Sequence, residues 1–338
     1  MISRRDLLLG AATVGFADAI RPMGPVLAAA SQPATAVSFS VPSGSCDCHA
    51  HIFGDPRRFP FSPARVYTPE PALVAEMRAL HNALHIDRVV IVQPTVYGTD
   101  NSCTLDAIKQ LGSAARGIAV IDDETPDSAL DAMGRAGICG IRVNLETLGQ
   151  TDPALARERF QNATRHLRRR DWHLEVYTRL SVVEAIAGDL AAVSEPVVFD
   201  HFGGAQAALG LAQPGFTTLL DLVRSGTAYV KISAAYRASK RPPDYPDVAP
   251  LAKALIAANP QRILWGTDWP HPAQVPGRKP ANITPLLQID DGRIFNLLAR
   301  WVPDAAIRKI ILVDNPARLY GFPRANADNT LPGEVHVT

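Results

Sequence analysis

The feature that most constrains the fold of this chain is a regular alternation between short apolar segments and longer segments with helical spacing. Short apolar, β-branched runs occur at residues 45–52, 87–93, 116–121, 138–145, 172–178, 196–202, 228–234 and 262–268. Apolar residues recur at helical spacing within residues 71–85, 153–170, 182–190, 215–225, 248–258 and 282–301. Continuous apolar strands separated by helices indicate a parallel sheet that is covered on both faces. Eight such units predict a single (β/α)8 (TIM) barrel. A doubly wound open sheet is the alternative, weakened because no GxGxxG turn follows the first strand.

The composition excludes several classes of protein. The 338 residues include 34 Lys and Arg against 33 Asp and Glu, a net charge of +1 that argues against a nucleic-acid partner. A hydrophobic content of 47% is too high for a disordered chain, and four cysteines are too few for a disulfide scaffold. No apolar run after residue 40 is long enough to span a bilayer. These exclusions leave a globular protein with one large core, and we expect it to be an enzyme.

The first thirty residues have the order of a targeting signal. Arg4 and Arg5 precede an apolar stretch at residues 7–20, and small residues then end at Ala30. The paired arginines resemble a bacterial twin-arginine signal. We therefore expect export to the periplasm, with cleavage after Ala30 and no membrane association after processing. A buried N-terminal helix in a cytoplasmic protein is the alternative.

The remaining boundaries follow from composition. Residues 31–44 are rich in Ser, Pro and Ala, and we expect them to form a flexible lead-in. Residues 45–322 contain all eight predicted units and should form the barrel. Residues 323–338 are polar and should form a frayed tail.

Two histidines on the first predicted strand are the first candidates for chemistry. Asp47, His49 and His51 alternate, so their side chains should share one face and both imidazoles should point into the barrel. Two adjacent imidazoles suit a divalent metal or a cluster that polarises a carbonyl, and a hydrogen-bonded pair of core histidines is the alternative. Cys46 and Cys48 should then face the covering helices as buried free thiols.

Two further candidates lie where predicted strands end. His201 ends the sixth strand and Asp268 ends the eighth, and catalytic groups of such barrels lie at the carboxyl ends of strands. Because Asp200 and His201 are neighbours in a strand, only one should point inward, and we expect it to be His201. Pro270 and Pro272 keep a helix from starting after Asp268, which argues against a simple capping role.

Three cations are candidates for binding an anionic substrate. Arg142 and Lys231 lie near strand ends, and Arg237 lies in the loop after the seventh strand. Arginine binds carboxylate or sulfonate through two donors, so cations at the mouth of a neutral protein favour an anionic substrate. Ordinary surface salt bridges are the alternative. Tyr177 and Gln93 are candidates for additional hydrogen bonds to the substrate.

Five motifs together resemble one known family. The sequences DCHAHIFGD, GIRVN, VFDHFGG, WGTDWPHP and DNPARLYGF are similar to those of the amidohydrolase superfamily, over residues 46–322. Within it, the chain resembles the lactonase branch that includes 2-pyrone-4,6-dicarboxylate lactonases and 4-sulfomuconolactone hydrolases.

The resemblance implies roles for four residues. His49 and His51 match the family's first-strand pair, His201 its sixth-strand histidine and Asp268 its general base. The implied activity is opening of a small, anionic, unsaturated lactone in bacterial breakdown of aromatic acids. These four residues would hold one divalent metal such as zinc, or would act without a metal, since the branch contains both kinds of enzyme.

Two other functions stay open. Metal-dependent decarboxylases of the same superfamily carry similar motifs, and an exported binding protein could retain the barrel without activity. The sequence also leaves open whether the chain forms a homo-oligomer.

Overall fold

The structure, a computed structural model, describes residues 30–273 and 279–323. Residues 1–29 of the expected signal sequence (1–30) and residues 324–338 of the expected tail lie outside the described residues. Within the described ranges, none of the helices has both the length and the apolar character needed to cross a membrane.

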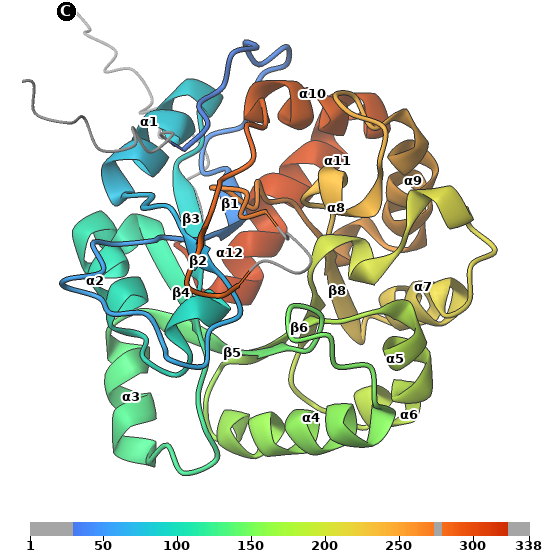
Figure 1. The fold of residues 1–338 in the computed structure, drawn as a ribbon. Coiled ribbons are helices and arrows are strands. Elements are labelled where there is room, and N and C mark those ends of the chain that lie inside the picture. The colour runs from blue at the N-terminus through green and yellow to red at the C-terminus, as the bar shows by residue number, and fades with distance from the viewer. Residues whose placement is uncertain (1–29, 274–278, 324–338) are drawn as a thin grey trace, which may run out of the picture.

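Eight parallel strands form the barrel that the alternation predicted (Figure 1). In chain order they are β1 (Cys46–Ala50), β3 (Arg88–Val92), β4 (Ala115–Ala119), β5 (Ile138–Asn144), β6 (His173–Tyr177), β7 (Val197–Phe199), β8 (Ala228–Lys231) and β9 (Ile263–Leu264). Each strand pairs with the next in this order, as right-handed β–α–β units require. Hydrogen bonds from Cys48 N to Trp265 O (2.9 Å) and from Asp268 N to His49 O (2.8 Å) then join the last segment to β1. These bonds close the sheet, so the open-sheet alternative is wrong.

Helices surround the strands and bury their apolar sides against them (Figure 1). They are α1 (Val74–Leu84), α2 (Ser102–Leu111), α3 (Asp127–Arg135), α4 (Pro153–Leu167), α5 (Leu180–Ala185), α6 (Ala187–Ala191), α7 (Phe216–Arg224), α8 (Ala235–Ala238), α9 (Ala249–Ala258), α10 (Asp291–Trp301), α11 (Ala305–Lys309) and α12 (Asn315–Tyr320). The helix expected over 282–301 begins only at Asp291, because the Asp290 side chain caps its first turn. Residues Ile283–Thr284 instead form β10, which pairs with β2 (Thr68–Pro69) in a separate two-stranded sheet.

The segment 31–44, expected to be a flexible lead-in, is held against the barrel. The Asp290 carboxylate accepts hydrogen bonds from the backbone N–H (3.1 Å) and the hydroxyl (2.5 Å) of Thr35. The indole N–H of Trp269 donates to the carbonyl of Ser31 at 3.1 Å. Side chains of α10 and of the loop after β9 thus satisfy polar groups of this segment, which composition alone did not indicate.

A β-bulge on β1 changes which side chains enter the barrel. The register of β1 against β3 shifts between Asp47 and Ala50, so one extra residue is inserted there. The bulge breaks the alternation, and Cys48 and His49 both face the interior.

The two cysteines of β1 therefore lie inside the barrel, and the expectation that they face the helices is wrong. Cys46 and Cys48 belong to one apolar cluster with residues of opposite strands, such as Val198 of β7. Tyr320 of α12 belongs to the same cluster and closes this end of the barrel. Asp47 points the other way, where it contacts the ring of a histidine in α1.

Candidate active site

One carboxylate and three imidazoles meet where the strands end. Oδ1 of Asp268 lies 3.5 Å from Nε2 of His49, 3.4 Å from Nε2 of His51 and 3.7 Å from Nε2 of His201. The two β1 histidines face each other at 3.3 Å between their Nε2 atoms. All four side chains are buried. The structure thus brings together, on one atom of Asp268, residues from three distant parts of the chain.

The positions of His201 and Asp268 depend on an unusual backbone. Both residues follow their strands and have positive φ angles, 48° and 65°. The left-handed conformation is uncommon for residues other than glycine and is often found at functional sites. Because β7 ends at Phe199, strand alternation does not apply beyond it, and Asp200 and His201 both contact the site. The expectation that only one of them points inward is therefore wrong.

The other ring nitrogen of two histidines is held by the surrounding structure. Nδ1 of His51 is 2.7 Å from the carbonyl oxygen of Val92, and Nδ1 of His201 is 2.9 Å from the hydroxyl of Ser233. Such contacts fix the orientation of each ring and direct its Nε2 toward Asp268. Ser233 was not expected from the sequence, which has no signal that marks this serine.

A buried network of charges lies beneath His49. The Lys231 ammonium donates to Glu175 and lies 3.2 Å from Oδ1 of Asp200. Arg142 donates to Oδ2 of Asp200 at 3.1 Å. Nδ1 of His49 is 3.1 Å from both Lys231 and Asp200. Two cations thus balance two carboxylates where water does not reach.

This network sets the charge of its own members. Burial and the nearby Asp200 charge raise the pKa of Glu175 to about 7. Burial would raise the pKa of Asp200 as well, but Lys231 and His49 hold it well below its usual range. Burial opposes the charge of Lys231, yet Glu175 and Asp200 raise its pKa. A charged lysine at the centre of the network follows from these contacts.

Two residues expected to bind substrate are engaged elsewhere. Lys231 is fully buried within the charge network rather than at the mouth. The Gln93 amide donates to the carbonyls of Gly98 and Asp100 and accepts from the hydroxyl of Thr104. Gln93 therefore shapes the loop after β3 and does not extend its side chain toward the histidines.

The second oxygen of Asp268 is held by the loop after β8. The hydroxyl of Tyr236 and Nε of Arg237 donate to Oδ2 at 2.5 and 2.7 Å. Burial would raise the pKa of Asp268, but Arg237 and His201 outweigh it and keep the pKa well below its usual range. Asp268 is therefore ionised at neutral pH. Tyr236 was missed from the sequence, although its place beside Arg237 was a usable signal.

Two of the histidines are neutral in this environment. Burial lowers the pKa of His49 well below its usual value and lowers that of His201 to about 4. A neutral imidazole can bind a metal or donate a hydrogen bond to a carbonyl oxygen. Both properties match the chemistry expected from these residues.

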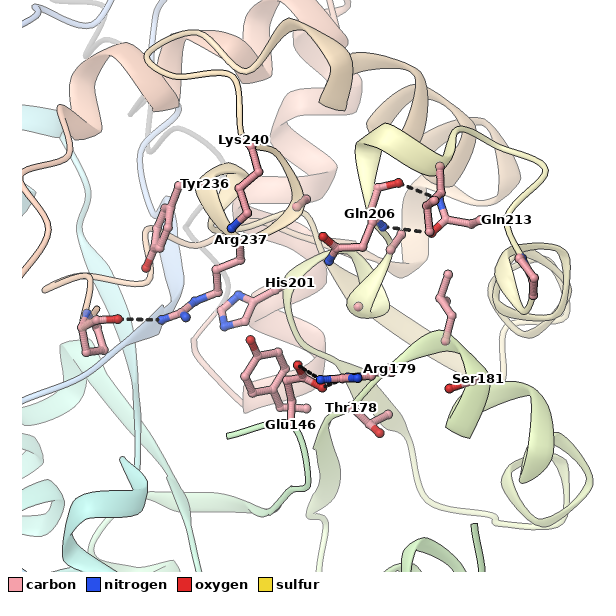
Figure 2. A pocket seen from close by; sticks show the side chains of 18 of the residues that line it. Glu146, Thr178, Arg179, Ser181, His201, Gln206, Gln213, Tyr236, Arg237 and Lys240 are labelled. Carbon is pink, nitrogen blue, oxygen red and sulfur yellow. Dashed lines mark hydrogen bonds and ion pairs between the residues drawn. The ribbon is translucent and has the colours of Figure 1, made fainter. Parts of the chain in front are cut away.

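Two adjoining cavities give access to Asp268. The inner pocket, about 30 Å³, is lined by Asp268, Arg142 and Tyr177 among others. The outer pocket, about 620 Å³, shares Tyr177, His201 and Arg237 with it and opens to solvent (Figure 2). The predicted substrate-binding residues Arg142, Tyr177 and Arg237 thus line the cavities that reach the site.

The donor set fits one divalent metal ion. The four facing atoms are separated by 3.3–3.7 Å where distances link them, close to the spacing of ligands bound at about 2.0–2.2 Å. His49, His201 and Asp268 form a potential metal-binding group. His49 also groups with Glu175 and Asp200, but Lys231 already occupies the space between those carboxylates.

Comparisons with known proteins identify the family of this chain. The amidohydrolase family profile matches residues 46–322. A 4-sulfomuconolactone hydrolase of Hydrogenophaga intermedia is 36% identical over 84% of this chain and 90% of the relative. A 2-pyrone-4,6-dicarboxylate hydrolase of Comamonas testosteroni is 32% identical over 83% and 92%.

A solved structure shares the same architecture. It is that of a probable 2-pyrone-4,6-dicarboxylic acid hydrolase from Acinetobacter baumannii with citric acid bound, with 26% identity and a TM-score of 0.69. The match covers 82% of this chain and 100% of that one. By its motifs, its barrel and these similarities, the chain belongs to the amidohydrolase family.

Proposed function

We propose that this protein hydrolyses the ring ester of a small anionic lactone. The observation that carries the proposal is the meeting of Oδ1 of Asp268 with the Nε2 atoms of His49, His51 and His201. An ionised base beside imidazoles that can polarise a carbonyl is what ester hydrolysis needs. The names of the relatives, a sulfomuconolactone hydrolase and a pyrone dicarboxylate hydrolase, favour an unsaturated lactone that bears carboxylate or sulfonate groups.

In the first step, Asp268 acts as the general base. A water molecule near Oδ1 of Asp268 loses a proton to this carboxylate as its oxygen attacks the lactone carbonyl. Nε2 of His201 lies 3.7 Å from Oδ1 of Asp268, and when Nδ1 accepts from the hydroxyl of Ser233, Nε2 carries a proton that stabilises the negative charge developing on the carbonyl oxygen. Nδ1 of His51 donates to the carbonyl of Val92, which leaves a lone pair on Nε2 of the neutral ring, as a metal ligand requires. Tyr236 and Arg237 keep Asp268 fixed during this transfer.

The second step opens the ring. The tetrahedral intermediate collapses, the bond between the carbonyl carbon and the ring oxygen breaks, and Asp268 returns its proton to that oxygen. One carboxyl group serves both transfers because they are sequential. The product is a carboxylic acid with an alcohol or an enol, and an enol then tautomerises to a ketone.

Arg142 and Arg237 line the inner pocket and orient the anionic groups of the substrate. The guanidinium of Arg142 is held by the carbonyl of Gln93 and by Asp200, and its Nε lies 3.9 Å from Oε1 of Glu175. Arg142 thus places a fixed positive charge beside the inner pocket, which suits a carboxylate or sulfonate group. The hydroxyl-bearing ring of Tyr177 lies against His201 at 4.9 Å between ring centroids, so it borders the reacting centre.

A divalent metal ion, for which zinc is our candidate, would be held by His49, His51, His201 and Asp268. Such an ion, when bound, supplies Lewis-acid polarisation of the carbonyl. The tautomer of His49 distinguishes metal-dependent from metal-free catalysis. With Nδ1 protonated toward Asp200, its Nε2 is free to bind a metal; with Nδ1 accepting from Lys231, its Nε2 is a donor that suits metal-free catalysis.

Elemental analysis combined with activity assays tests the function. The purified protein should hydrolyse pyrone dicarboxylate or sulfomuconolactone, and metal near one equivalent should be lost together with activity on chelation if the metal alternative holds. Release of carbon dioxide from an aromatic acid without lactone hydrolysis would favour the decarboxylase. Ligand binding without turnover would favour the binding protein.

We also propose that residues 1–30 direct export to the periplasm, on the basis of the arginine pair and the small residues that end at Ala30. Replacement of Arg4 and Arg5 by lysine should leave the protein in the cytoplasm, as cell fractionation would detect. Periplasmic recovery of this variant would contradict the twin-arginine route.

A further inference from the structure

The outer pocket is larger than the reacting centre requires. The inner pocket of about 30 Å³ holds little more than one or two water molecules, and the outer pocket of about 620 Å³ adjoins it at His201 and Arg237. Pockets of 300–1,000 Å³ typically bind ligands of drug-like size. There is therefore room beside His201 and Arg237 for a substituent outside the lactone ring.

One cation on the wall of this pocket is not engaged by the protein. Arg179 is paired with Glu146 at 2.8 Å, and Arg237 is paired with Asp268 at 2.7 Å. Lys240 also lines the pocket and has no ion-pair or hydrogen-bond partner among the described residues. Figure 2 shows its side chain reaching toward Arg237 over the space above His201.

A second polar side chain faces the same space. The backbone of Gln206 is fixed on both sides by Gln213, which accepts from its N–H at 2.9 Å and donates to its carbonyl at 3.1 Å. Figure 2 shows the Gln206 amide extending from this anchored backbone toward the region of Lys240 and His201. Among the described residues, the amide has no hydrogen-bond partner. The pocket thus presents one free ammonium and one free amide from two separate loops.

The outer pocket has one cation that is not paired with a carboxylate of the described residues. Of the described cations that line the outer pocket, Arg179 and Arg237 have carboxylate partners, which leaves Lys240 for an added anion. An ammonium and an amide N–H together match the oxygens of a carboxylate or sulfonate.

We propose that the outer pocket is a subsite for a second anionic group, carried by the substrate outside its lactone ring and bound by Lys240 and Gln206. The proposal rests on the proposed function in assuming that the ring lies at Asp268. Lys240 then selects between substrates with one and with two anionic groups. It acts on binding rather than on bond cleavage.

Binding of stable aromatic acids tests this without any turnover. Benzoate is compared by calorimetry with benzene-1,3-dicarboxylate and with 3-carboxyphenylacetate, which place a second carboxylate at two distances from the first. The full-length purified protein should bind at least one dicarboxylate more tightly than benzoate. In Lys240→Met this advantage should fall about tenfold, because the variant lacks the ammonium that pairs with the second carboxylate. Benzoate affinity should be unchanged, and Lys240→Arg should retain most of the advantage.

Lys253→Met is the matched control, because Lys253 is an exposed lysine of α9 that does not line the pocket. It should leave both affinities unchanged. The proposal is overturned if the unaltered protein does not prefer either dicarboxylate, if Lys240→Met leaves the preference intact, or if Lys253→Met lowers it equally.

Hydrolysis assays on the unaltered protein separate this result from the proposed function. Lactone hydrolysis without an effect of Lys240→Met on dicarboxylate preference removes the subsite and keeps the lactonase. Dicarboxylate preference that depends on Lys240, without hydrolysis of any lactone, removes the lactonase and keeps an anion subsite.

Discussion

The hydroxyl of Tyr236 donates a 2.5 Å hydrogen bond to Oδ2 of Asp268, so the two carboxylate oxygens have different surroundings. Arg237 donates to the same oxygen, whereas Oδ1 faces the three imidazoles. One oxygen is thus held by the protein and the other is directed at the reacting centre. The first two predictions follow from this division.

Replacement of Asp268 by Asn should abolish most turnover. An amide cannot take the proton from water, and loss of a general base typically costs roughly 10²- to 10⁴-fold in rate. The measurement is kcat on the best lactone of the panel, with benzene-1,3-dicarboxylate affinity as the check that the pocket is intact. Asp221→Asn, on the exposed face of α7, serves as the control. Near-normal turnover in a folded Asp268→Asn protein would exclude Asp268 as the base.

Replacement of Tyr236 by Phe should shift the pH dependence of the reaction. Loss of a donor to the ionised carboxylate makes protonation of Asp268 easier and raises its pKa. Activity depends on the ionised form, so the acidic limb of the kcat/KM profile should move to higher pH. Tyr245→Phe is the control, because Tyr245 is buried but does not line the pockets described above. An unchanged profile with a uniform loss of rate would indicate a packing role alone.

Replacement of Lys231 by Met should strongly destabilise the fold. It leaves Glu175 and Asp200 without their central cation, and breaking a buried pair on one side costs roughly 3–5 kcal/mol. Urea unfolding monitored by fluorescence measures the change in the free energy of unfolding. The matched control is Lys309→Met, which removes an exposed ion pair with Asp314 and should cost at most about 1 kcal/mol. Equal losses in the two variants would contradict a central role for Lys231.

Protonation of His173 should contribute to acid unfolding. Burial lowers the pKa of His173 from 6.5 to about 3, with the Lys231 charge acting in the same direction. The unfolded chain therefore binds a proton below about pH 6.5 that the native chain takes up only near pH 3. Stability should fall as the pH decreases through this window, by about 2 kcal/mol between pH 6.5 and pH 4.5.

His173→Phe tests this contribution, since neither ring nitrogen of His173 has a hydrogen-bond partner among the described residues. Its free energy of unfolding should change less between pH 7 and pH 4.5 than that of the unaltered protein. His85→Gln, at an exposed position, should not alter this difference. An identical pH dependence in His173→Phe would show that other groups cause the acid sensitivity.

Much of the barrel could be predicted because its strands are fully buried. Apolar runs such as residues 87–93 are flanked by segments with helical spacing, and this pattern depends only on local sequence. The last barrel strand shows where local sequence is not sufficient. Residues 262–268 read as one strand, yet the regular strand covers only Ile263–Leu264, and the chain then takes a left-handed conformation at Asp268.

The direction in which individual side chains point from their strands was less predictable. Alternation placed Cys48 outside and Asp200 away from the site, and both expectations failed. In each case the backbone departs from a regular strand, through a bulge at Cys48 and through left-handed residues after Phe199. Such departures depend on the pairing partners of the strand, which sequence periodicity does not contain.

The sequence by itself determined the eight-unit barrel and placed His49, His51, His201 and Asp268 at its mouth, because burial and strand ends leave local patterns. Only the tertiary structure decided that Asp268 uses one oxygen for Tyr236 and Arg237 and the other for the histidines. It also decided that Lys231 is enclosed by carboxylates whereas Lys240 remains available in the outer pocket. Lys231 and Lys240 have the same side chain, and the role of each depends on which charges lie within a few ångströms of it.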